Sequence, residues 1–359
     1  MSSNPKITPA FRADTNRGIS AYRIAIVGAG GLRGKEVAEV LRDRNFPTLD
    51  IKLLDEDDSL GQLESTGDEV TFIQSLRSEN FEKLDFTFFT SDAETTRKNW
   101  IKPRNAGSTI IDLSSALENE PDAVVRSPWV ERELGKIYTP QLQPGPAITA
   151  HPTATALALI LARLQKLGDL KSVVTNVFLP ASEFGQKGMD ELHEQTVNLL
   201  SFQPLPKKIF DTQVAFNLVT RYGESAVNSV STTRDLILRH YRLIAGENAP
   251  KTSLLVVQAP TFHGHAMSLH VTLSQDADTH NIAKLLEGEH LTLTPPNEEP
   301  PNNVAVAGQE EILISIDKDD NDANSFWLWA ASDNLRISAC TAVECAETMA
   351  ATRPRGQVQ

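Results

Sequence analysis

The fold is decided by Arg23-Ile24-Ala25-Ile26-Val27-Gly28-Ala29-Gly30-Gly31-Leu32-Arg33-Gly34, which Lys35-Glu36-Val37-Ala38-Glu39-Val40-Leu41 follows directly. A short apolar run enters a glycine cluster and leaves it with a 3.6-residue apolar period. This pattern predicts a buried parallel strand, a tight turn and a helix. Glycines let the backbone approach a pyrophosphate, and the free N–H groups at the helix start attract its negative charge. The stretch therefore predicts half of a dinucleotide-binding unit.

The glycine spacing differs from the usual fingerprint. Gly28-x-Gly30 calls for a third glycine where Arg33 stands, so the fitting register is Gly28, Gly31 and Gly34. An ordinary glycine turn is the alternative, but a strand before, a helix after and a second strand ending in an acid favour the nucleotide site. The expected cofactor-binding residues of the turn are Gly28, Gly30, Gly31, Leu32, Arg33 and Gly34.

An acidic cluster follows the second expected strand, residues 49–54. An acid at this point accepts hydrogen bonds from an adenosine ribose and repels a 2′-phosphate. Asp55 is the candidate, and it favours NAD over NADP, although the cofactor is predicted only as one of the two. A solvated acidic turn over residues 55–58 is the alternative.

Further short apolar runs at residues 70–73, 86–89 and 109–113 alternate with helical or loop segments. This alternation predicts an α/β fold with a Rossmann-type, doubly wound parallel sheet. Thr90 and Ser91 follow one expected strand, and Ser114 and Ser115 follow another. Ligands bind beyond the carboxyl ends of such strands, so Thr90 and Ser91 are expected at the cofactor. Helix N-caps are the alternative for these hydroxyls.

Composition narrows the function classes. The chain has 359 residues and a formal net charge of −13, which disfavours nucleic acid or an anionic membrane surface as partner. A small-molecule ligand is the better expectation. No run of 18 apolar residues exists, and residues 1–20, expected as a flexible tail, have no apolar signal region, so we expect a cytoplasmic protein. Cys340 and Cys345 are about 140° apart on an expected helix, which predicts reduced thiols.

Several segments taken together resemble the aspartate-semialdehyde dehydrogenase family in order and spacing, over residues 21–349. Besides the turn at Gly28, they are residues 110–116, 148–156, 178–185 with 188–192, 215–217, 264–265 and 333–336.

The resemblance implies a nucleotide-binding domain followed by a mixed α/β domain that supplies the substrate site and a homodimer interface. The implied boundaries are residues 21–152 for NAD(P) binding, 153–331 for dimerisation and substrate, and 332–359 for a helix that returns to the first domain. Sequence patterns agree with this plan. They predict helices at 153–166, 186–200, 224–245 and 335–351, the last capped by Asn334, and strands at 172–180, 252–260, 265–274, 310–316 and 325–331.

The family's nucleophile is missing. Its members carry a segment resembling Ala-Asn-Pro-Asn-Cys-Ser-Thr, and this chain has Ala150-His151-Pro152-Thr153-Ala154-Thr155-Ala156. Ala154 therefore replaces the cysteine whose thiolate attacks the aldehyde, and alanine cannot do this chemistry. We expect Thr153 and Thr155 to be poor substitutes, because a hydroxyl needs a strong adjacent base.

Other family positions also differ. The family's glutamine falls on Leu179, and its two arginines fall on Gln258 and near Glu118, where an aspartyl phosphate would be held weakly or repelled. His265 is the one catalytic position retained. It is interpreted either as a general acid/base or as a hydrogen-bonded core histidine.

No metal site is expected. His263 and His265 would share a face of a strand, but no third ligand lies at a telling spacing. Residues 317–322 resemble a calcium loop only superficially and are expected to form a hairpin turn.

The sequence therefore leaves three functions open. One is a dimeric, nicotinamide-dinucleotide-binding member of the family whose phosphorylating aldehyde chemistry is lost. Another is an active oxidoreductase that transfers hydride without a covalent intermediate, using His265. The third is an aspartate-semialdehyde dehydrogenase in the ordinary sense.

Overall fold

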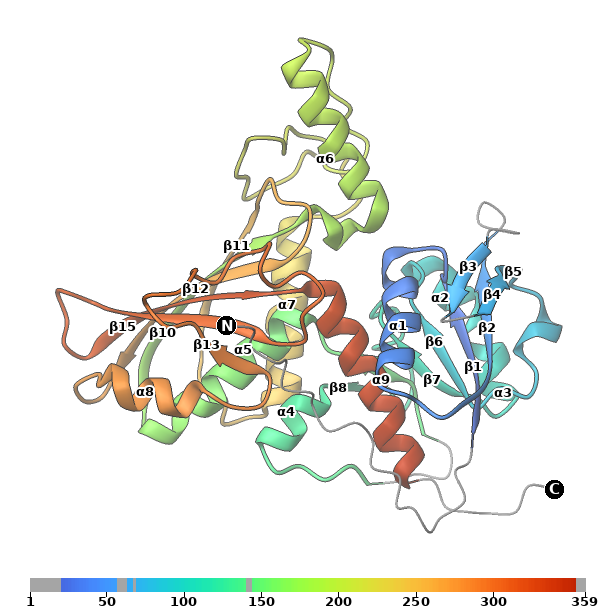
Figure 1. Ribbon diagram of the computed structural model, residues 1–359, viewed down its shortest axis with the longest axis horizontal. Coiled ribbons are helices and arrows are strands. Elements are labelled where there is room, and N and C mark those ends of the chain that lie inside the picture. Colours follow the sequence, from blue (N-terminus) through green and yellow to red (C-terminus); the bar gives the residue numbers. More distant parts are fainter. Residues whose placement is uncertain (1–20, 57–62, 67–68, 140–143, 353–359) are drawn as a thin grey trace. The chain divides into compact units, whose positions relative to one another are not determined.

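The computed structural model describes residues 21–56, 63–66, 69–139 and 144–352. The chain forms two compact units (Figure 1). Unit 1 comprises residues up to Val124, residues 138–149 and residues from Ala342 onward, and unit 2 comprises residues 125–137 and 150–341. The expected tail, residues 1–20, lies outside the described residues.

Unit 1 is built on a seven-stranded sheet in the order β5-β2-β1-β6-β7-β9-β8. The contacts from β5 to β9 are parallel, which confirms the predicted doubly wound sheet. Its strands are β1 (Tyr22–Val27), β2 (Thr48–Asp55), β5 (Gln74–Ser75), β6 (Phe86–Phe89), β7 (Thr109–Asp112), β8 (Val124–Arg126) and β9 (Ala147–Thr149). Its helices include α1 (Leu32–Asp43), α2 (Ala93–Asn99) and α3 (Ile101–Asn105), with a 3₁₀ turn at Ser78–Phe81.

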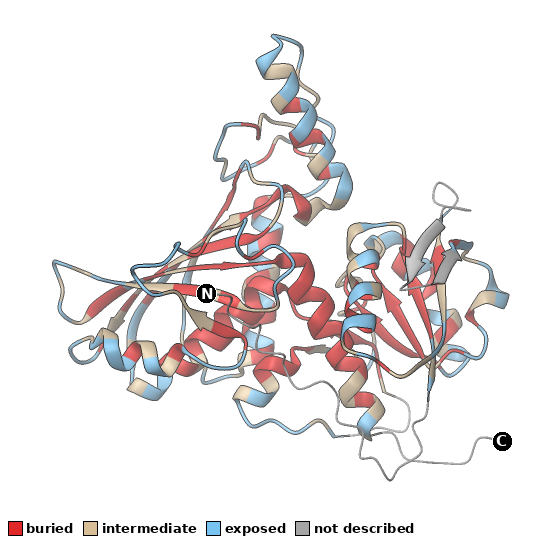
Figure 2. Cartoon of the chain, in the orientation of Figure 1, coloured by how far each residue is buried: buried red, intermediate tan, exposed pale blue. Residues whose placement is uncertain are grey.

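The central strands of this sheet are mostly apolar and buried. In β1, Ile24 to Val27 are fully buried, and β6 is buried at every position. A strand with two covered faces needs apolar residues at odd and even positions alike, so it shows a continuous run rather than alternation. Figure 2 shows the buried residues concentrated on these strands.

One expected strand of this sheet is placed wrongly by the sequence pattern. The run at 70–73 falls on β4 (Glu69–Phe72), which pairs antiparallel with β3 (Leu63–Thr66) in a separate two-stranded sheet. Pairing with a close neighbour in the chain closes a shorter loop and costs less conformational entropy than joining the large sheet.

Unit 2 contains a six-stranded mixed sheet in the order β11-β10-β12-β15-β14-β13. Its strands are β10 (Leu170–Leu179), β11 (Ser253–Gln258), β12 (His265–Leu273), β13 (Leu291–Leu293), β14 (Ile312–Lys318) and β15 (Ser325–Ser332). The helices are α4 (Pro128–Glu133), α5 (Pro152–Leu164), α6 (Gly185–Leu200), α7 (Val230–Ala245) and α8 (Thr279–Leu286), with 3₁₀ turns at Gln165–Leu167 and Ala181–Phe184. β14 and β15 pair antiparallel, which confirms the hairpin expected at 317–322.

Two helix starts differ from the sequence prediction because the capping side chain lies elsewhere. Helix α7 begins at Val230 rather than at 224, since the Ser229 hydroxyl accepts a hydrogen bond from Thr232 N at 3.0 Å. The last helix, α9 (Asn334–Thr352), is capped by Asp333, which accepts from Leu335 N and Arg336 N. Asn334 instead accepts hydrogen bonds from Ser182 Oγ and Gly264 N.

The end of α9 belongs to unit 1, where Arg44 forms ion pairs with Glu344 and Glu347 at 3.2 and 2.8 Å. Over the described part of the chain, no helix combines the length and apolar character needed to cross a bilayer.

Candidate active site

In unit 1, the turn between β1 and α1 demands glycine at two positions. Gly28 has a φ of +86°, and a Cβ added there would lie 2.5 Å from Ser91 N. A Cβ on Gly34 would press into Gly28 O and lie 2.7 Å from Ala29 Cα. A Cβ on Gly31 would make only an ordinary contact, 3.4 Å from Gly28 O. Glycine is therefore required at Gly28 and Gly34 because the backbone packs closely there, and not because the turn needs a given number of glycines.

Side chains after neighbouring strands hold the turn in place. Asp55 Oδ2 accepts a hydrogen bond from Gly30 N at 2.8 Å. The Thr90 hydroxyl donates to Val27 O at 2.8 Å and to Gly28 O at 3.1 Å. Both residues thus contact the glycine turn directly. Glu56 accepts from the Thr95 hydroxyl at 2.8 Å, and Asp57 and Asp58, the end of the acidic cluster, lie outside the described residues.

The hydroxyls of Thr90 and Ser91 are not helix caps. Asp92 caps α2 by accepting from Thr95 N at 2.9 Å. Ser91 Oγ instead hydrogen-bonds Thr96 Oγ1 at 3.1 Å. The cap alternative for these two hydroxyls is therefore wrong, since the acid one residue later occupies the capping position.

The turn suits the pyrophosphate of a dinucleotide. The first amides of α1, at Leu32 and Arg33, have no acceptor within the helix and lie at the positive end of its dipole. Arg33, at the position of the usual third glycine, donates from Nη1 to Leu113 O at 3.4 Å. The backbone cradle that a Cβ at Gly28 or Gly34 would fill is the observation that carries this fit.

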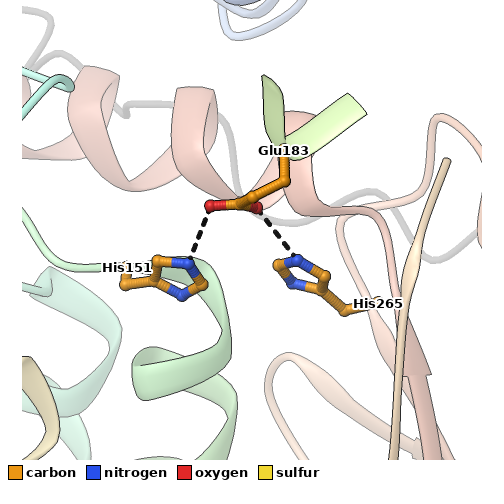
Figure 3. Close-up of side chains that lie close together, drawn as sticks. All are labelled: His151, Glu183 and His265. Atoms are coloured by element: carbon orange, nitrogen blue, oxygen red, sulfur yellow. Dashed lines mark hydrogen bonds and ion pairs between the residues drawn. The ribbon is translucent and has the colours of Figure 1, made fainter. Parts of the chain in front are cut away.

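A buried cluster in unit 2 brings together His151, Glu183 and His265 (Figure 3). His151 Nε2 lies 3.0 Å from Glu183 Oε1, and His265 Nε2 lies 3.1 Å from Glu183 Oε2. The rings of His151 and His265 stack with their centroids 5.5 Å apart. Residue 151 precedes α5, residue 183 lies in the 3₁₀ turn after β10, and residue 265 begins β12. Three distant segments therefore converge on one carboxylate.

The hydrogen bonds define the protons of the cluster. His151 Nδ1 accepts from the backbone N–H of Thr153 at 3.2 Å, so its proton is on Nε2 and is donated to Glu183. His265 donates from Nε2 to the same carboxylate, which leaves Nδ1 free to accept from the Thr153 hydroxyl at 2.8 Å. For His151 the assignment follows from the amide of Thr153, which can only donate, and for His265 it follows from the ionised carboxylate at Nε2, which can only accept.

Burial alone would raise the pKa of the Glu183 carboxyl. The charges and hydrogen bonds of His151 and His265 outweigh burial and hold that pKa well below its usual range. Burial lowers the pKa of His151, and the attraction of Glu183 offsets it in part. Burial, followed by the charge of Glu183, raises the pKa of Tyr222. The cluster is thus an ionised carboxylate between two imidazole N–H donors.

The ligand atoms of these three residues lie within 4.8 Å of one another, a spacing that could hold a metal ion. Coordination needs the Nε2 lone pair, whereas the amide of Thr153 fixes the Nε2 proton of His151. The hydrogen bonds therefore describe a proton network. The pair considered in the sequence, His263 with His265, does not converge, because Gly264 has a φ of +80° and turns the chain between them.

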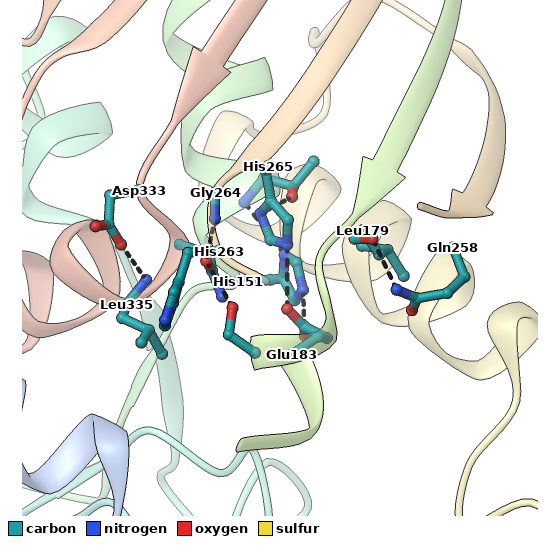
Figure 4. Close-up of polar contacts among 12 residues, drawn as sticks. His151, Leu179, Glu183, Gln258, His263, Gly264, His265, Asp333 and Leu335 are labelled. Carbon is teal, nitrogen blue, oxygen red and sulfur yellow. Dashed lines mark hydrogen bonds and ion pairs between the residues drawn. The ribbon is translucent and has the colours of Figure 1, made fainter. Parts of the chain in front are cut away.

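Three of the other positions compared with the family are buried and apolar or neutral. Ala154 and Leu179 are fully buried. Gln258 donates to Leu179 O and Ala259 O and accepts from the Tyr222 hydroxyl at 2.7 Å (Figure 4). Its side chain is thereby engaged by neutral protein groups. Glu118 lies in unit 1 and is half-buried.

Both cysteines are buried in α9 and form no disulfide. Neither belongs to the His151, Glu183 and His265 cluster.

The sequence interpretation missed Glu183 and His151 as partners of His265. Both stood in the segments used for the resemblance, at 178–185 and 148–156. The sequence offered one indication of them, namely that an acid and a histidine stand beside expected strand and helix ends. Their convergence is tertiary and leaves no spacing pattern in the chain.

Comparisons with known proteins agree with the two-unit architecture. Residues 23–136 match the model "Semialdehyde dehydrogenase, NAD binding domain", and residues 161–337 match "Semialdehyde dehydrogenase, dimerisation domain". The chain belongs to the semialdehyde dehydrogenase family.

Particular relatives fall into two named groups. The USG-1 protein homolog of Azotobacter vinelandii is 32% identical over 92% of this chain and 98% of its own length. An aspartate-semialdehyde dehydrogenase of Rickettsia bellii is 29% identical over 92% of this chain and 98% of its own. A solved structure of a probable aspartate-semialdehyde dehydrogenase from Pseudomonas aeruginosa has a TM-score of 0.81, at 27% identity over 92% of this chain and 99% of that one.

Proposed function

We propose that this chain is a dimeric, nicotinamide-dinucleotide-binding member of the family that does not run the cysteine-dependent phosphorylating reaction. The observation that carries the proposal is the environment of His265. The position next to its partner Thr153 carries the methyl group of Ala154, and His265 itself is engaged by a hydroxyl and a carboxylate. A covalent thioester needs sulfur within reach of this histidine.

The cofactor part of the proposal rests on the turn in unit 1. Gly28, Gly30, Gly31, Leu32, Arg33 and Gly34 would hold the pyrophosphate, with Asp55, Thr90 and Ser91 beside them. When bound, a nicotinamide ring supplies a hydride acceptor or donor. Asp55 favours NAD over NADP because its carboxylate would repel a 2′-phosphate.

Calorimetric titration of the purified protein with NAD and with NADP tests the cofactor preference. Tighter binding of NAD, lost in Asp55→Ala, is expected. Because Asp55 also accepts from Gly30 N, Asp55→Asn keeps an acceptor for that amide and serves as the matched control for turn structure. Equal binding of both nucleotides would contradict the preference for NAD.

The lost reaction is tested by turnover with aspartate semialdehyde, phosphate and either nucleotide. We expect none at ordinary enzyme rates, which are about 1–1,000 per second. Turnover in that range, abolished in His265→Gln, would defeat the proposal. We place the protein in the cytoplasm, which the two free cysteines support.

A second candidate is hydride transfer without a covalent intermediate. It is favoured by the placement of His265, which Glu183 orients and whose Nδ1 can exchange a proton through the Thr153 hydroxyl. His265 would then donate or accept the proton at a carbonyl oxygen. A screen of unphosphorylated carbonyl compounds for NADH oxidation, with His265→Gln as control, separates it from the first candidate.

A further inference from the structure

We propose that Thr153, His265 and Glu183 form a nucleophile, a general base and a positioning acid, and that the chain hydrolyses small uncharged acyl esters without any nucleotide. This activity is independent of the proposed function, because it needs neither the cofactor turn nor sulfur.

The three residues are connected in the order of a hydrolytic triad, with the two ring nitrogens of the histidine exchanged. Thr153 Oγ1 lies 2.8 Å from His265 Nδ1. On the other side of the ring, His265 Nε2 lies 3.1 Å from Glu183 Oε2 (Figure 3). A nucleophile bonded to a base that a third group orients is the recurring arrangement for activating a hydroxyl. The adjacent base that a threonine nucleophile needs would be His265, which this contact places beside the Thr153 hydroxyl.

The charge of Glu183 supports proton transfer to His265. As His265 takes the hydroxyl proton on Nδ1 it becomes a cation, and the carboxylate on its other nitrogen stabilises that cation. The second donor to Glu183, His151, fixes the carboxylate from the opposite side. The acid therefore stays ionised and aligned while its neighbour gains a proton.

The start of α5 supplies a donor for the oxyanion. Among its first residues, Pro152 has no N–H and Thr153 N donates to His151 Nδ1, while Thr155 N donates to His151 O. The amide of Ala154 remains, and it has no acceptor among the described residues. The amide of the residue after the nucleophile is the one that oxyanion holes commonly use.

A polar group next to His265 is also left for a ligand. Ser332 pairs directly with His265 across the sheet, so the two side chains share a face. Its buried hydroxyl has no hydrogen-bond partner among the described residues. A buried orphan hydroxyl beside a general base is a natural contact for a bound ester oxygen.

The substrate class follows from burial and charge. Thr153 and His265 are fully buried, so a substrate reaches them only when the surrounding residues open locally, which favours a small acyl group. A substrate without negative charge avoids repulsion by the Glu183 carboxylate. We therefore assign short neutral acyl esters.

The reaction balances without a co-reactant. Thr153 Oγ attacks the ester carbonyl carbon while its proton passes to His265 Nδ1. The bond from carbon to the alcohol oxygen breaks, and that oxygen leaves with the proton from His265. Water then attacks the acyl-threonine, and its proton moves through His265 to Thr153 Oγ as the carboxylic acid departs.

Hydrolysis of p-nitrophenyl acetate by the full-length protein, without nucleotide, tests the proposal. We expect Thr153→Val and His265→Gln to lower kcat/KM about 100-fold or more, with Thr153→Ser within about tenfold of the unchanged protein. Thr155→Val is the matched control, because Thr155 is an equally buried threonine of the same helix whose hydroxyl bonds Ser127 Oγ at 3.1 Å. It should keep the activity within about threefold.

Mass spectrometry supplies a readout that a structural role would not move. An acetyl group should accumulate on the peptide containing Thr153 in the rapidly quenched protein and be absent in Thr153→Val. Hydrolysis by the unchanged protein no faster than by Thr153→Val, or acetylation elsewhere, would overturn the proposal. Loss in Thr155→Val equal to that in Thr153→Val would do the same.

Discussion

Two carboxylates, Asp112 in unit 1 and Glu183 in unit 2, are held in opposite ways by their hydrogen-bond donors. Asp112 in unit 1 accepts from the Ser114 hydroxyl at 2.6 Å and from the amides of Ser114 and Leu117. Burial raises its pKa, although these hydrogen bonds lower it in part. Glu183 in unit 2 accepts from two imidazoles, and its pKa is well below the usual range.

The difference in donors distinguishes a carboxylate that fixes a turn from one that can support proton transfer. Neutral donors fix the turn after β7 but leave the charge of Asp112 costly in its buried site. Ionisable donors make the charge of Glu183 favourable and connect it through His265 to the Thr153 hydroxyl. A buried acid of the first kind shapes a loop, and one of the second kind can support proton transfer.

Removing the carboxylate of unit 2 has the largest expected effect. Glu183→Ala leaves the Nε2 protons of His151 and His265 buried without an acceptor, so the free energy of unfolding should fall by about 4 kcal/mol. Urea denaturation at neutral pH measures it. A loss below about 1 kcal/mol would mean that the two imidazoles do not depend on this acid.

The glycine turn of unit 1 gives the next largest effect. Gly34→Ala pushes a methyl group into the backbone of Gly28 and Ala29 and should cost about 3 kcal/mol, together with nucleotide binding. Gly31→Ala is the matched control, because its Cβ has room and the cost should stay below about 1 kcal/mol. Equal costs at both positions would show that the close approach at Gly34 is not what requires glycine.

The pH dependence of stability contrasts the two units. The pKa of Glu183 is lowered from 4.5, so its stabilisation is present above that value and is lost as the pH falls through the folded pKa. The pKa of His151 is lowered from 6.5, so its stabilisation is also lost as the pH falls, beginning at a higher pH. The pKa of Asp112 is raised from 3.8, so its contribution is full below that value and is lost as the pH rises.

Replacing each carboxylate by its amide distinguishes the two opposite pH dependences. The cost of Glu183→Gln should shrink between about pH 7.5 and about pH 4, and the cost of Asp112→Asn should grow, each by about 1 kcal/mol. Parallel urea denaturation curves at the two pH values measure both. Costs that change in the same direction would remove the contrast.

At neutral pH alone, Asp112→Asn gives the smallest effect. Asparagine keeps the size of the side chain and one acceptor oxygen but loses one amide partner, so the cost should be about 1 kcal/mol. Thermal unfolding followed by circular dichroism measures it. A cost as large as that of Glu183→Ala would mean that the carboxylate of unit 1 is itself part of an ionised network.

The sequence predicts unit 1 well because its signals are local. The apolar run of β1, the glycines and the start of α1 are adjacent in the chain, and each restricts the backbone by itself. The prediction for residues 70–73 is wrong about the sheet, because an apolar strand pattern does not indicate which strand it pairs with. The prediction that Asn334 caps the last helix is wrong, because Asp333, one residue earlier, is an equally favourable N-cap residue and accepts the hydrogen bond.

The cluster of unit 2 could not be predicted in the same way. His151, Glu183 and His265 are separated by 32 and 82 residues, and only the tertiary fold brings them together. The resemblance to the family singled out His265 and Ala154. It implies no role for the Thr153 hydroxyl, one residue before the absent sulfur.

Selective ¹⁵N labelling of histidine, read by NMR at neutral pH and assigned with His151→Gln and His265→Gln, tests the central claim most directly. The claim is that Glu183 holds both imidazoles with the proton on Nε2, which leaves Nδ1 of His265 as the base for Thr153. We predict protonated Nε2 and unprotonated Nδ1 in both rings. A proton on Nδ1 with a bare Nε2 in either ring would contradict the account.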